Sequence, residues 1–124
     1  MGREAPVMRR KSKYGAIPTT VDGVRFASKA EAKRDAELRL LLRSGEISHL
    51  KRQPRFPLVV NGVPICTYVA DWQYKDYRVT STRLHSHMTE IDVVEDRKGV
   101  QTPAFKIKWA LAKALYPEIE WRLS

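Results

Sequence analysis

The sequence predicts an α/β fold in which a mixed central sheet is flanked by helices. Two segments place apolar residues at helical spacing, several strand patterns lie between these segments, and one more strand pattern follows the second. The predicted order is therefore helix, three strands, helix, strand. A chain of 124 residues favours a single domain. Its 43% hydrophobic and 30% charged residues are typical of a folded globular protein.

The first third of the chain is predicted to contain an arm, a hairpin and a helix. Residues 1–14 lack periodicity and carry five mutually repelling cations, which predicts a flexible basic arm. This arm is either a solvated tail or a segment that contacts phosphates. Asp22-Gly23 lies between β-branched residues and predicts a short hairpin. Residues 28–44 predict a helix, because Ser28 can cap its start.

The middle of the chain is predicted to supply the three strands. Residues 55–60 alternate apolar side chains with others, and Asn61-Gly62 supplies the positive-φ pair of a two-residue hairpin turn. The return strand, residues 63–74, is mostly apolar, which is typical of a central strand buried on both faces. Residues 75–90 are polar and basic and predict either a loop or a hairpin extension. Residues 91–98 predict the next strand.

The last part of the chain predicts a helix and a final strand. Residues 103–116 have helical periodicity, with Thr102 as N-cap and Pro103 at the first helical position, where its missing N–H is harmless. Residues 118–123 alternate apolar and charged side chains, which predicts a half-exposed strand. A strand, helix, strand unit of this kind predicts a right-handed parallel crossover.

The charge of the chain indicates a polyanionic partner. There are 23 Lys and Arg residues against 14 Asp and Glu residues, for a net charge of +9 and a pI near 9.9. Nucleic acid is the commonest such partner, and an anionic membrane surface is the alternative. The chain has no signal-peptide pattern and no apolar run of roughly 18 residues, so a membrane role is not expected. Cys66 is the single cysteine, which excludes an internal disulfide and a cysteine-based metal cluster, and a cytoplasmic setting is expected.

Two carboxylates occupy apolar strand patterns. Asp71 follows an apolar run, and Asp96 follows two valines. Burying a carboxylate is unfavourable without a counter-charge or a metal ion. Lys98 lies two positions after Asp96, so both project from one strand face. This set suits phosphodiester hydrolysis, in which carboxylates hold Mg²⁺ or Mn²⁺ and a lysine stabilises charge or orients water. The alternative is an ordinary surface ion pair.

These residues resemble a known superfamily. Asp71, followed by Asp96-Arg97-Lys98 on the next strand, resembles the PD-(D/E)XK nucleases, whose restriction-endonuclease-like core has the same helix, three strands, helix, strand order. The chain is more closely similar to a family of small phage and prophage endonuclease-like proteins. The matching stretches are KYGAIPTTVDGVRFASKAEAKRDAEL at 13–38, LKRQPRFPL at 50–58, YVADWQY at 68–74, VVEDRKG at 93–99 and TPAFKIKWALAKALYP at 102–117.

The resemblance implies specific roles and a setting. It implies a magnesium cofactor that Mn²⁺ can replace, and a phage- or prophage-encoded protein in the cytoplasm of a bacterial host. The implied site consists of Asp71 as central metal ligand, Asp96 as second acidic ligand, the backbone carbonyl of Arg97 as third ligand, Lys98 as catalytic lysine, Glu31 as an additional acid and metal ligand, and Gln53 as an accessory polar residue.

The chain departs from the superfamily pattern in two places. Ala70 stands where the superfamily has proline. Asp96 comes 25 positions after Asp71, which is longer than a tight hairpin needs. The single nuclease domain, residues 15–124, is therefore predicted to carry a basic insertion at 75–90 that contacts DNA.

Three other residues have competing interpretations. Ser28-Lys29-Ala30-Glu31 is a capping box, which explains Glu31 without catalysis. Glu31 lies seven positions before Leu38, however, and this placement on the apolar face favours the site. Glu95 projects from the opposite strand face to Asp96 and is interpreted as structural. His85 and His87 have no third metal ligand nearby and are interpreted as part of a polar loop.

The sequence as a whole predicts a magnesium-dependent DNA endonuclease that is structure-selective, as for a Holliday junction, or weakly sequence-specific. Its partners are duplex or branched DNA and a second copy of the chain, with neither a membrane nor a small-molecule cofactor. The alternatives are a non-catalytic nucleic-acid-binding module and a subunit of a phage DNA-processing complex. The predicted DNA-binding residues are Arg9, Arg10, Lys11, Lys13, Lys75, Arg78, Arg83, Lys106 and Lys108.

Overall fold

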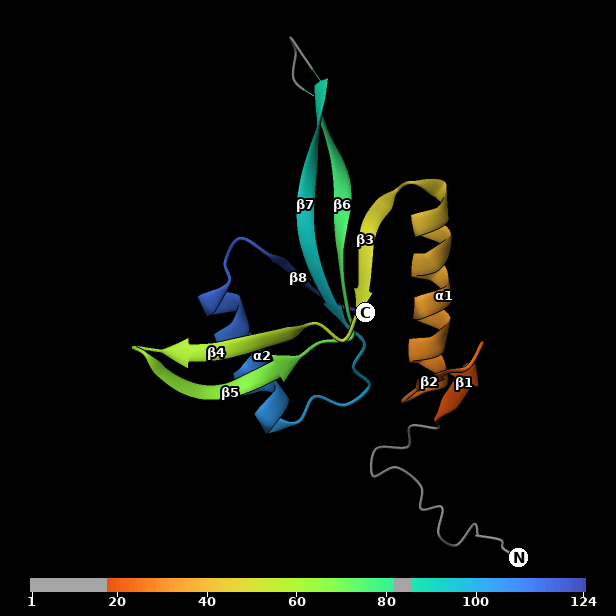
Figure 1. The fold of residues 1–124 in the computed structure, drawn as a ribbon. Helices are drawn as coiled ribbons and strands as arrows, with labels where there is room; N and C mark the ends of the chain where they lie inside the picture. Colours follow the sequence, from red (N-terminus) through yellow and green to blue (C-terminus); the bar gives the residue numbers. More distant parts are fainter. Residues whose placement is uncertain (1–17, 82–85) are drawn as a thin grey trace, which may run out of the picture. The chain divides into compact units, whose positions relative to one another are not determined.

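A computed structural model describes residues 18–81 and 86–124, with the side chains of 79–81 and 86–87 left aside. The chain divides into two compact units, Met1–Ala36 and Glu37–Ser124. The predicted arm, residues 1–14, lies outside the described residues. The elements in Figure 1 are β1 (Thr19–Val21), β2 (Val24–Phe26), α1 (Lys29–Ser44), β3 (Ile47–Arg52), β4 (Arg55–Val60), β5 (Val63–Val69), β6 (Trp72–Ser81), β7 (Ser86–Asp96), α2 (Pro103–Leu115) and β8 (Glu120–Leu123).

The first unit contains the predicted hairpin and the start of α1. Strands β1 and β2 pair antiparallel around Asp22 and Gly23, which both have positive φ values of 50° and 80°. The helix begins at Lys29, directly after the predicted cap, and the Ser28 hydroxyl accepts a hydrogen bond from the Glu31 N–H at 3.1 Å. The hairpin and the helix start are therefore confirmed.

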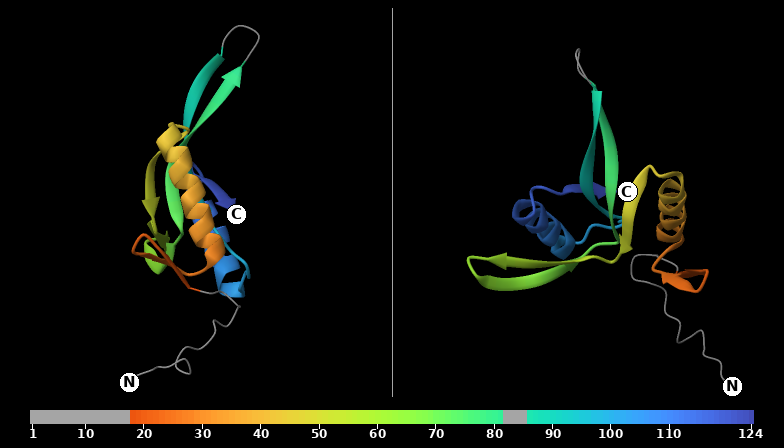
Figure 2. Two further views of the ribbon diagram at one scale, coloured as in Figure 1. Left: turned by 90° about the vertical axis from the view of Figure 1, so that its right-hand side faces the viewer. Right: turned by 45° about the horizontal axis from the view of Figure 1, so that its top comes forward.

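The second unit is built on a mixed four-stranded sheet with the order β3-β6-β7-β8. Strands β6 and β7 pair antiparallel along their whole length and continue past β3 and β8 as a two-stranded ribbon (Figure 2). The hairpin alternative for residues 75–90 is thus confirmed, and the loop alternative is wrong. Strand β8 is parallel to β7 and is reached through α2, as the strand, helix, strand pattern predicted.

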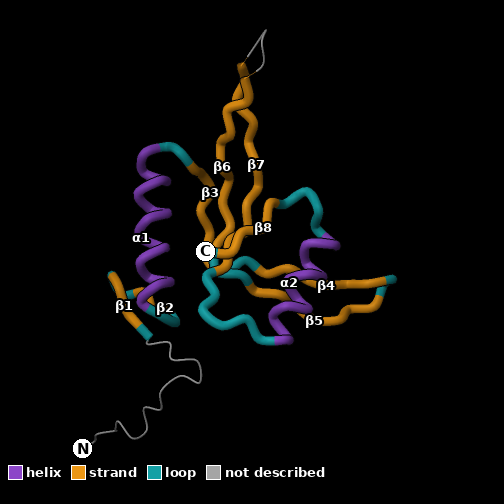
Figure 3. The backbone as a smooth tube through the Cα atoms, turned by 180° about the vertical axis from the view of Figure 1, so that it is seen from behind, coloured by secondary structure: helices purple, strands orange, loops and turns teal. Residues whose placement is uncertain are grey.

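The predicted strand 63–74 is wrong as a single element. Strand β5 ends at Val69, and β6 begins at Trp72 in a different sheet. Strands β4 and β5 form a separate hairpin around Asn61 and Gly62, with φ values of 51° and 77°, and this hairpin packs against α2 (Figure 3). In the first half of the run, Cys66 and Tyr68 pack in the cluster that contains α2, whereas Val63, Ile65 and Val69 are exposed; the second half belongs to the central sheet.

Two apolar clusters lie on the two faces of the central sheet. Neighbouring residues Val93 and Val94 of β7 belong to different clusters, because alternate strand residues point to opposite faces. The cluster with Val94 contains aromatic side chains of α2 and the β4–β5 hairpin. The cluster with Val93 contains Leu38 of α1, Trp72 and Tyr74. Within residues 18–81 and 86–124, no helix is long and apolar enough to cross a membrane.

Candidate active site

The candidate site lies where the chain bends from one sheet into the other. Asp71 is half-buried at the bend between β5 and β6, whereas the sequence placed it inside a buried strand. Gln53 lies at the matching bend between β3 and β4. Its N–H donates to the Asp71 carbonyl at 2.9 Å, and the Ala70 N–H donates to the Pro54 carbonyl at 3.2 Å. Both strands therefore cross the bend together, which holds Asp71 at the edge of the central sheet.

The bend brings Asp71 next to the end of β7. Trp72 pairs with Glu95, so Asp71 and Asp96 occupy the next position of the same antiparallel ladder. The Arg97 N–H donates to the Asp71 Oδ2 at 2.8 Å, and the Ser124 N–H donates to the Asp96 carbonyl at 2.9 Å. These contacts gather two carboxylates that are far apart in the sequence at one end of the sheet.

Asp96 is fixed through one carboxylate oxygen and leaves the other without a hydrogen bond. The residue is 0% exposed. The Tyr68 hydroxyl of β5 donates to the Asp96 Oδ2. The Asp96 Oδ1 is buried and has no hydrogen-bond partner in the described part of the chain. Because buried polar atoms are almost always hydrogen-bonded, this oxygen is suited to receive a cation or a donor from outside the chain.

Lys98 reaches the same carboxylate from beyond the end of the strand. The sequence placed Asp96 and Lys98 together on β7, but β7 ends at Asp96. The Lys98 Nζ lies 3.9 Å from the Asp96 Oδ1 and 4.9 Å from the ring centre of Phe105 in α2. A separation of 3.9 Å is too long for a hydrogen bond but within the range of an ion pair, so the Lys98 ammonium supplies a counter-charge without satisfying the Asp96 Oδ1 as a hydrogen-bond acceptor.

The neighbouring carboxylate, Glu95, has the opposite setting. It is also buried, at 1% exposed, but it lies on the other face of the sheet. The Tyr74 hydroxyl donates to the Glu95 Oε1 at 2.7 Å, and Arg122 donates to the Tyr74 oxygen at 3.3 Å. Glu95 is therefore tied into a network within the fold, which agrees with its interpretation as structural.

Both tyrosines that hold these carboxylates ionise less readily than usual. Burial, together with the hydrogen bond to Glu95, raises the pKa of Tyr74 to about 12. Burial also raises the pKa of Tyr68, and the hydrogen bond to Asp96 and the charges of Asp96 and Asp71 add to the effect. Each hydroxyl therefore remains a hydrogen-bond donor at neutral pH.

The donor set fits a hard divalent cation held partly by water. Among residues 18–81 and 86–124, no group of three or more His, Cys, Asp or Glu side chains converges, so the chain offers the two carboxylates of Asp71 and Asp96. Mg²⁺ commonly binds through one or two carboxylates and keeps several waters. The buried Asp96 Oδ1 without a partner is the observation that favours a cation here.

The other predicted site residues have different surroundings. Glu31 is buried in the first unit, and its Oε1 accepts a hydrogen bond from the Ala27 N–H at 2.8 Å. The capping box is confirmed, because the Ser28 hydroxyl accepts from the Glu31 N–H and the Glu31 carboxylate reaches back to the backbone before the helix at Ala27. Gln53 is beside Asp71 through its backbone, has a positive φ of 53° and exposes its side chain. A positive φ in a non-glycine residue is strained and is often found at functional sites.

The predicted DNA-binding residues fall into three groups. Arg9, Arg10, Lys11, Lys13 and Arg83 lie outside the described residues, as do the side chains of His85 and His87. Lys75 and Arg78 are paired with acids, because the Lys75 Nζ is 2.9 Å from the Asp92 Oδ1 and the Arg78 guanidinium is 2.9 Å from the Glu120 Oε1. Lys106 is exposed and Lys108 is half-buried on α2, and neither forms an ion pair with any described residue.

Two residues of the site were not predicted from the sequence. Tyr68 fixes Asp96 from 28 positions away, and Phe105 supports the Lys98 ammonium. In the sequence both look like ordinary aromatic core residues, and both pack in the apolar cluster that contains Val94. A signal was present for Tyr68 alone, since a buried carboxylate needs a donor and a strand tyrosine near Asp71 can supply one.

The fold and the site define an α/β protein with two carboxylates and a lysine gathered at the end of β7. The sequence pattern of the family described as "Protein of unknown function (DUF1064)" matches residues 11–124, and the chain belongs to this family. No curated protein and no solved structure matches the chain significantly.

Proposed function

We propose that this protein is a magnesium-dependent DNA endonuclease that hydrolyses phosphodiester bonds and is structure-selective or weakly sequence-specific. One observation carries the proposal. The buried Asp96 Oδ1 has no hydrogen-bond partner among the described residues, and it faces the Lys98 ammonium next to Asp71. A buried carboxylate oxygen of this kind is costly unless a cation or donor reaches it, and phosphodiester hydrolysis uses such a cation together with a lysine.

The topology also supports the proposal. Around the four-stranded sheet, the elements follow the order α1, β3, β6, β7, α2, β8. This is the helix, three strands, helix, strand order of the PD-(D/E)XK core, with the β4–β5 hairpin added between the first two strands. We therefore propose a restriction-endonuclease-like core in which the bend before β6 and the end of β7 carry the two acidic residues, Asp71 and Asp96.

Asp71 and Asp96 would hold the Mg²⁺ ion, with the carbonyl of Arg97 as a further ligand and Glu31 as an additional acid. When bound, the cation supplies charge stabilisation and makes a nucleophilic water available at neutral pH. The chain contributes the geometry. The Tyr68 hydroxyl holds the Asp96 Oδ2, so the carboxylate presents its Oδ1 toward Lys98. The Phe105 ring faces the Lys98 ammonium and restricts its position.

Lys98 would stabilise the charge that develops on the phosphate oxygens. Its side chain is 32% exposed, so the ammonium, which lies 4.9 Å from the ring centre of Phe105, can still be reached from solvent. An ammonium aimed at developing charge in a partly dry site lowers the barrier more than one in bulk water. The basic chain, with a net charge of +9, would attract the DNA. A homodimer would cut both strands of a duplex or a branched junction.

Cleavage of defined DNA tests the proposed function. The purified chain is incubated with a supercoiled plasmid and a four-way junction in Mg²⁺, in Mn²⁺ and in EDTA. We expect cleavage that requires the metal, that Asp71→Asn abolishes, and that Lys98→Ala slows by about a hundredfold or more. The matched control is Glu46→Gln. Glu46 is exposed, and its carboxylate accepts a hydrogen bond from the hydroxyl of Ser44 at the end of α1.

Three outcomes would replace the proposal in different ways. Cleavage that survives both Asp71→Asn and Lys98→Ala places the chemistry elsewhere. Salt-sensitive DNA binding without cleavage under any metal condition identifies a non-catalytic nucleic-acid-binding module instead. Cleavage that appears after a phage replication or packaging protein is added identifies a subunit of a larger DNA-processing complex.

A further inference from the structure

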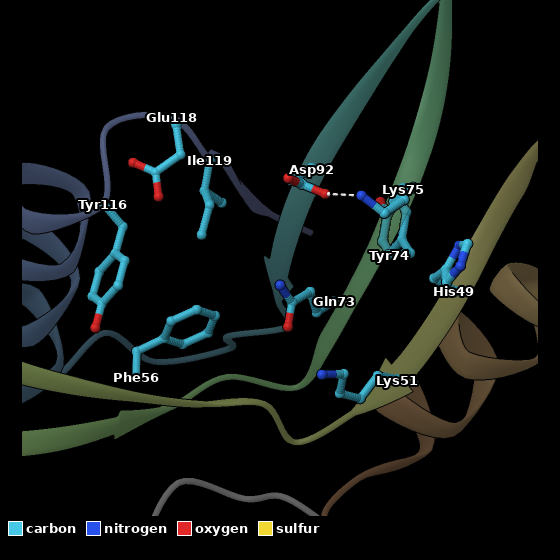
Figure 4. A pocket seen from close by; sticks show the side chains of 10 residues that line it. All are labelled: His49, Lys51, Phe56, Gln73, Tyr74, Lys75, Asp92, Tyr116, Glu118 and Ile119. Carbon is cyan, nitrogen blue, oxygen red and sulfur yellow. Dashed lines mark hydrogen bonds and ion pairs between the residues drawn. The ribbon is translucent and has the colours of Figure 1, made fainter.

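A pocket of about 470 Å³ lies on the central sheet in the second unit. Its floor is formed by β3 and β6, and its far wall by the start of β4 and the segment between α2 and β8 (Figure 4). The pocket is lined by residues that include His49, Lys51, Phe56, Gln73, Tyr116 and Glu118. None of these residues belongs to the candidate active site.

Two polar side chains in the pocket are available to a ligand. Lys51 and Gln73 are directly paired across β3 and β6, and both side chains point into the pocket (Figure 4). Within residues 18–81 and 86–124, neither side chain forms a hydrogen bond or an ion pair. Lys75 in the same pocket differs, because Asp92 and Glu90 lie 2.9 Å and 3.5 Å from its ammonium. The pocket therefore offers one unpaired cation beside one amide with a donor and an acceptor.

The far wall of the pocket is aromatic. The rings of Phe56 and Tyr116 meet edge to face, with centroids 5.3 Å apart and planes at 69°. The Tyr116 hydroxyl donates to the Pro57 carbonyl at 2.8 Å, which fixes the ring against the hairpin. Tyr116 remains half-exposed, so part of its ring is accessible to a flat ligand. Aromatic faces of this kind bind nucleobases by stacking.

A residue with a strained backbone, His49, lies near Lys51 on the β3 side of the pocket. Strand β3 contains one extra residue between Ser48 and Lys51, and His49 in this bulge has a φ of 54°. Such a conformation is strained for a non-glycine residue, and bulges often re-aim side chains beside functional sites. Lys51, which is unpaired in the described part of the chain, and His49 lie on the β3 side of the pocket, and the Glu118 carboxylate lies on the opposite side (Figure 4). This distribution of charge favours one orientation of an anionic ligand, with its negative group toward β3 and away from Glu118.

We propose that this pocket binds one unpaired nucleotide of a DNA strand. The phosphate lies toward Lys51 and His49, the Gln73 amide binds the edge of the base, and the face of the base contacts Tyr116. The nucleotide must be unpaired because the two faces of a base inside a duplex are already stacked and its Watson–Crick edge is paired, so Tyr116 could not contact the face of the base. The inference rests on the proposed function and narrows its substrate to DNA with a single-stranded segment near the cleaved bond.

The position of the pocket on the sheet agrees with this inference. The pair formed by Lys51 and Gln73 is two positions along the β3–β6 ladder from the contact between Gln53 and Asp71. Two residues of a strand span about 6.6 Å, which is comparable with the spacing of neighbouring phosphates. A strand that reaches Asp71 therefore passes the pocket within a few nucleotides.

Photo-crosslinking tests the pocket independently of cleavage. The full chain is mixed in EDTA with a forked DNA that carries 5-iodouracil in its single-stranded arm, and with a matched duplex in which the same base is paired. After irradiation, mass spectrometry locates the crosslink. We expect it on the peptide that contains Tyr116, with about tenfold more product from the unpaired base.

Lys51→Ala and Gln73→Ala should each weaken binding of the fork about fivefold or more. Lys33→Ala, an exposed lysine of α1, is the matched control.

The outcomes separate this inference from the proposed function. A crosslink at Tyr116 without metal-dependent cleavage supports the pocket and contradicts the nuclease. Cleavage of the fork with crosslinks outside the pocket, or equal crosslinking of the paired base, overturns the pocket and leaves the nuclease standing. Binding of free thymidine monophosphate at Tyr116, with no crosslink between Tyr116 and the fork, assigns the pocket to free nucleotides and overturns the inference. A chain that binds no DNA overturns both.

Discussion

Two adjacent residues of β7 show how the setting of a side chain determines its role. Asp96 and Glu95 are both buried carboxylates. Asp96 accepts a hydrogen bond from the Tyr68 hydroxyl, and Glu95 accepts one from the Tyr74 hydroxyl. The Tyr74 oxygen also contacts Arg122, which completes the network around Glu95. The Asp96 Oδ1 lacks such a partner among the described residues. This difference is the reason why the proposed metal site includes Asp96 and not Glu95.

The paired tyrosines give a matched test of this difference. Tyr68→Phe and Tyr74→Phe each remove one hydroxyl from a buried carboxylate and keep the ring. Both should lower the free energy of unfolding by about 1 to 3 kcal/mol, as measured by urea titration. Only Tyr68→Phe should weaken Mn²⁺ binding, by about tenfold or more, because it frees the Asp96 carboxylate to rotate. Isothermal titration calorimetry measures this affinity, and equal Mn²⁺ affinities in the two variants would contradict a positioning role for Tyr68.

Tyr74 also predicts how stability depends on alkaline pH. Burial raises its pKa from 10 in the unfolded chain to about 12 in the fold. Because the folded pKa is the higher one, this contribution to stability is complete below pH 10 and disappears as the pH rises from 10 through 12. The urea midpoint of the wild type should therefore fall over this window, and that of Tyr74→Phe should fall less steeply. Identical slopes for the two proteins would show that Tyr74 is not shielded in the fold.

At the scale of elements, the helices and hairpins could be predicted from the sequence, and β3 could not. The helices carry local signals, such as Ser28 and Thr102 at their caps and Pro103 at the start of α2. In β3 the extra residue at His49 interrupts the alternation that identifies strands. The break between β5 and β6 was also hidden, since both halves of the run are apolar and only the pairing partners change at Asp71.

Glu31 at the start of α1 has two possible roles that one substitution separates. Its Oε1 accepts the Ala27 N–H, and an amide oxygen can do the same. Glu31→Gln should therefore keep the thermal midpoint of the wild type. We expect its metal-dependent cleavage to fall about tenfold or more, because an amide is a poorer ligand for Mg²⁺ than a carboxylate. Unchanged cleavage with unchanged stability would assign Glu31 to the helix cap alone.

At the scale of the whole molecule, the net charge of +9 predicts DNA binding that weakens steeply with salt. The structure distinguishes which cations contribute. Lys106 is exposed without an ion pair in the described part of the chain, whereas Arg78 is paired with Glu120. Lys106→Ala should lower the slope of log K against log salt by about one, and Arg78→Ala should lower it by less. Fluorescence anisotropy with a labelled junction measures both slopes, and a larger effect of Arg78→Ala would contradict this assignment.

The site as a whole was predictable in part. Asp71, Asp96 and Lys98 stood out because charged residues in apolar strand patterns require a physical explanation. Tyr68 and Phe105 could not be assigned, because their contacts depend on how the β4–β5 hairpin and α2 fold over the sheet. Sequence patterns identify a residue whose burial is unusual, but its partners across the fold come from tertiary packing.

The most direct test is to locate the metal ion. A crystal of the wild-type protein soaked in Mn²⁺ should show an anomalous difference peak between the carboxylates of Asp71 and Asp96, within reach of the Asp96 Oδ1 that has no hydrogen bond among the described residues. The Asp71→Asn protein, soaked in the same way, should show a weaker peak or none. A wild-type crystal with no peak at this position, or with its peak at another group of residues, would contradict the proposed metal site and the nuclease mechanism built on it.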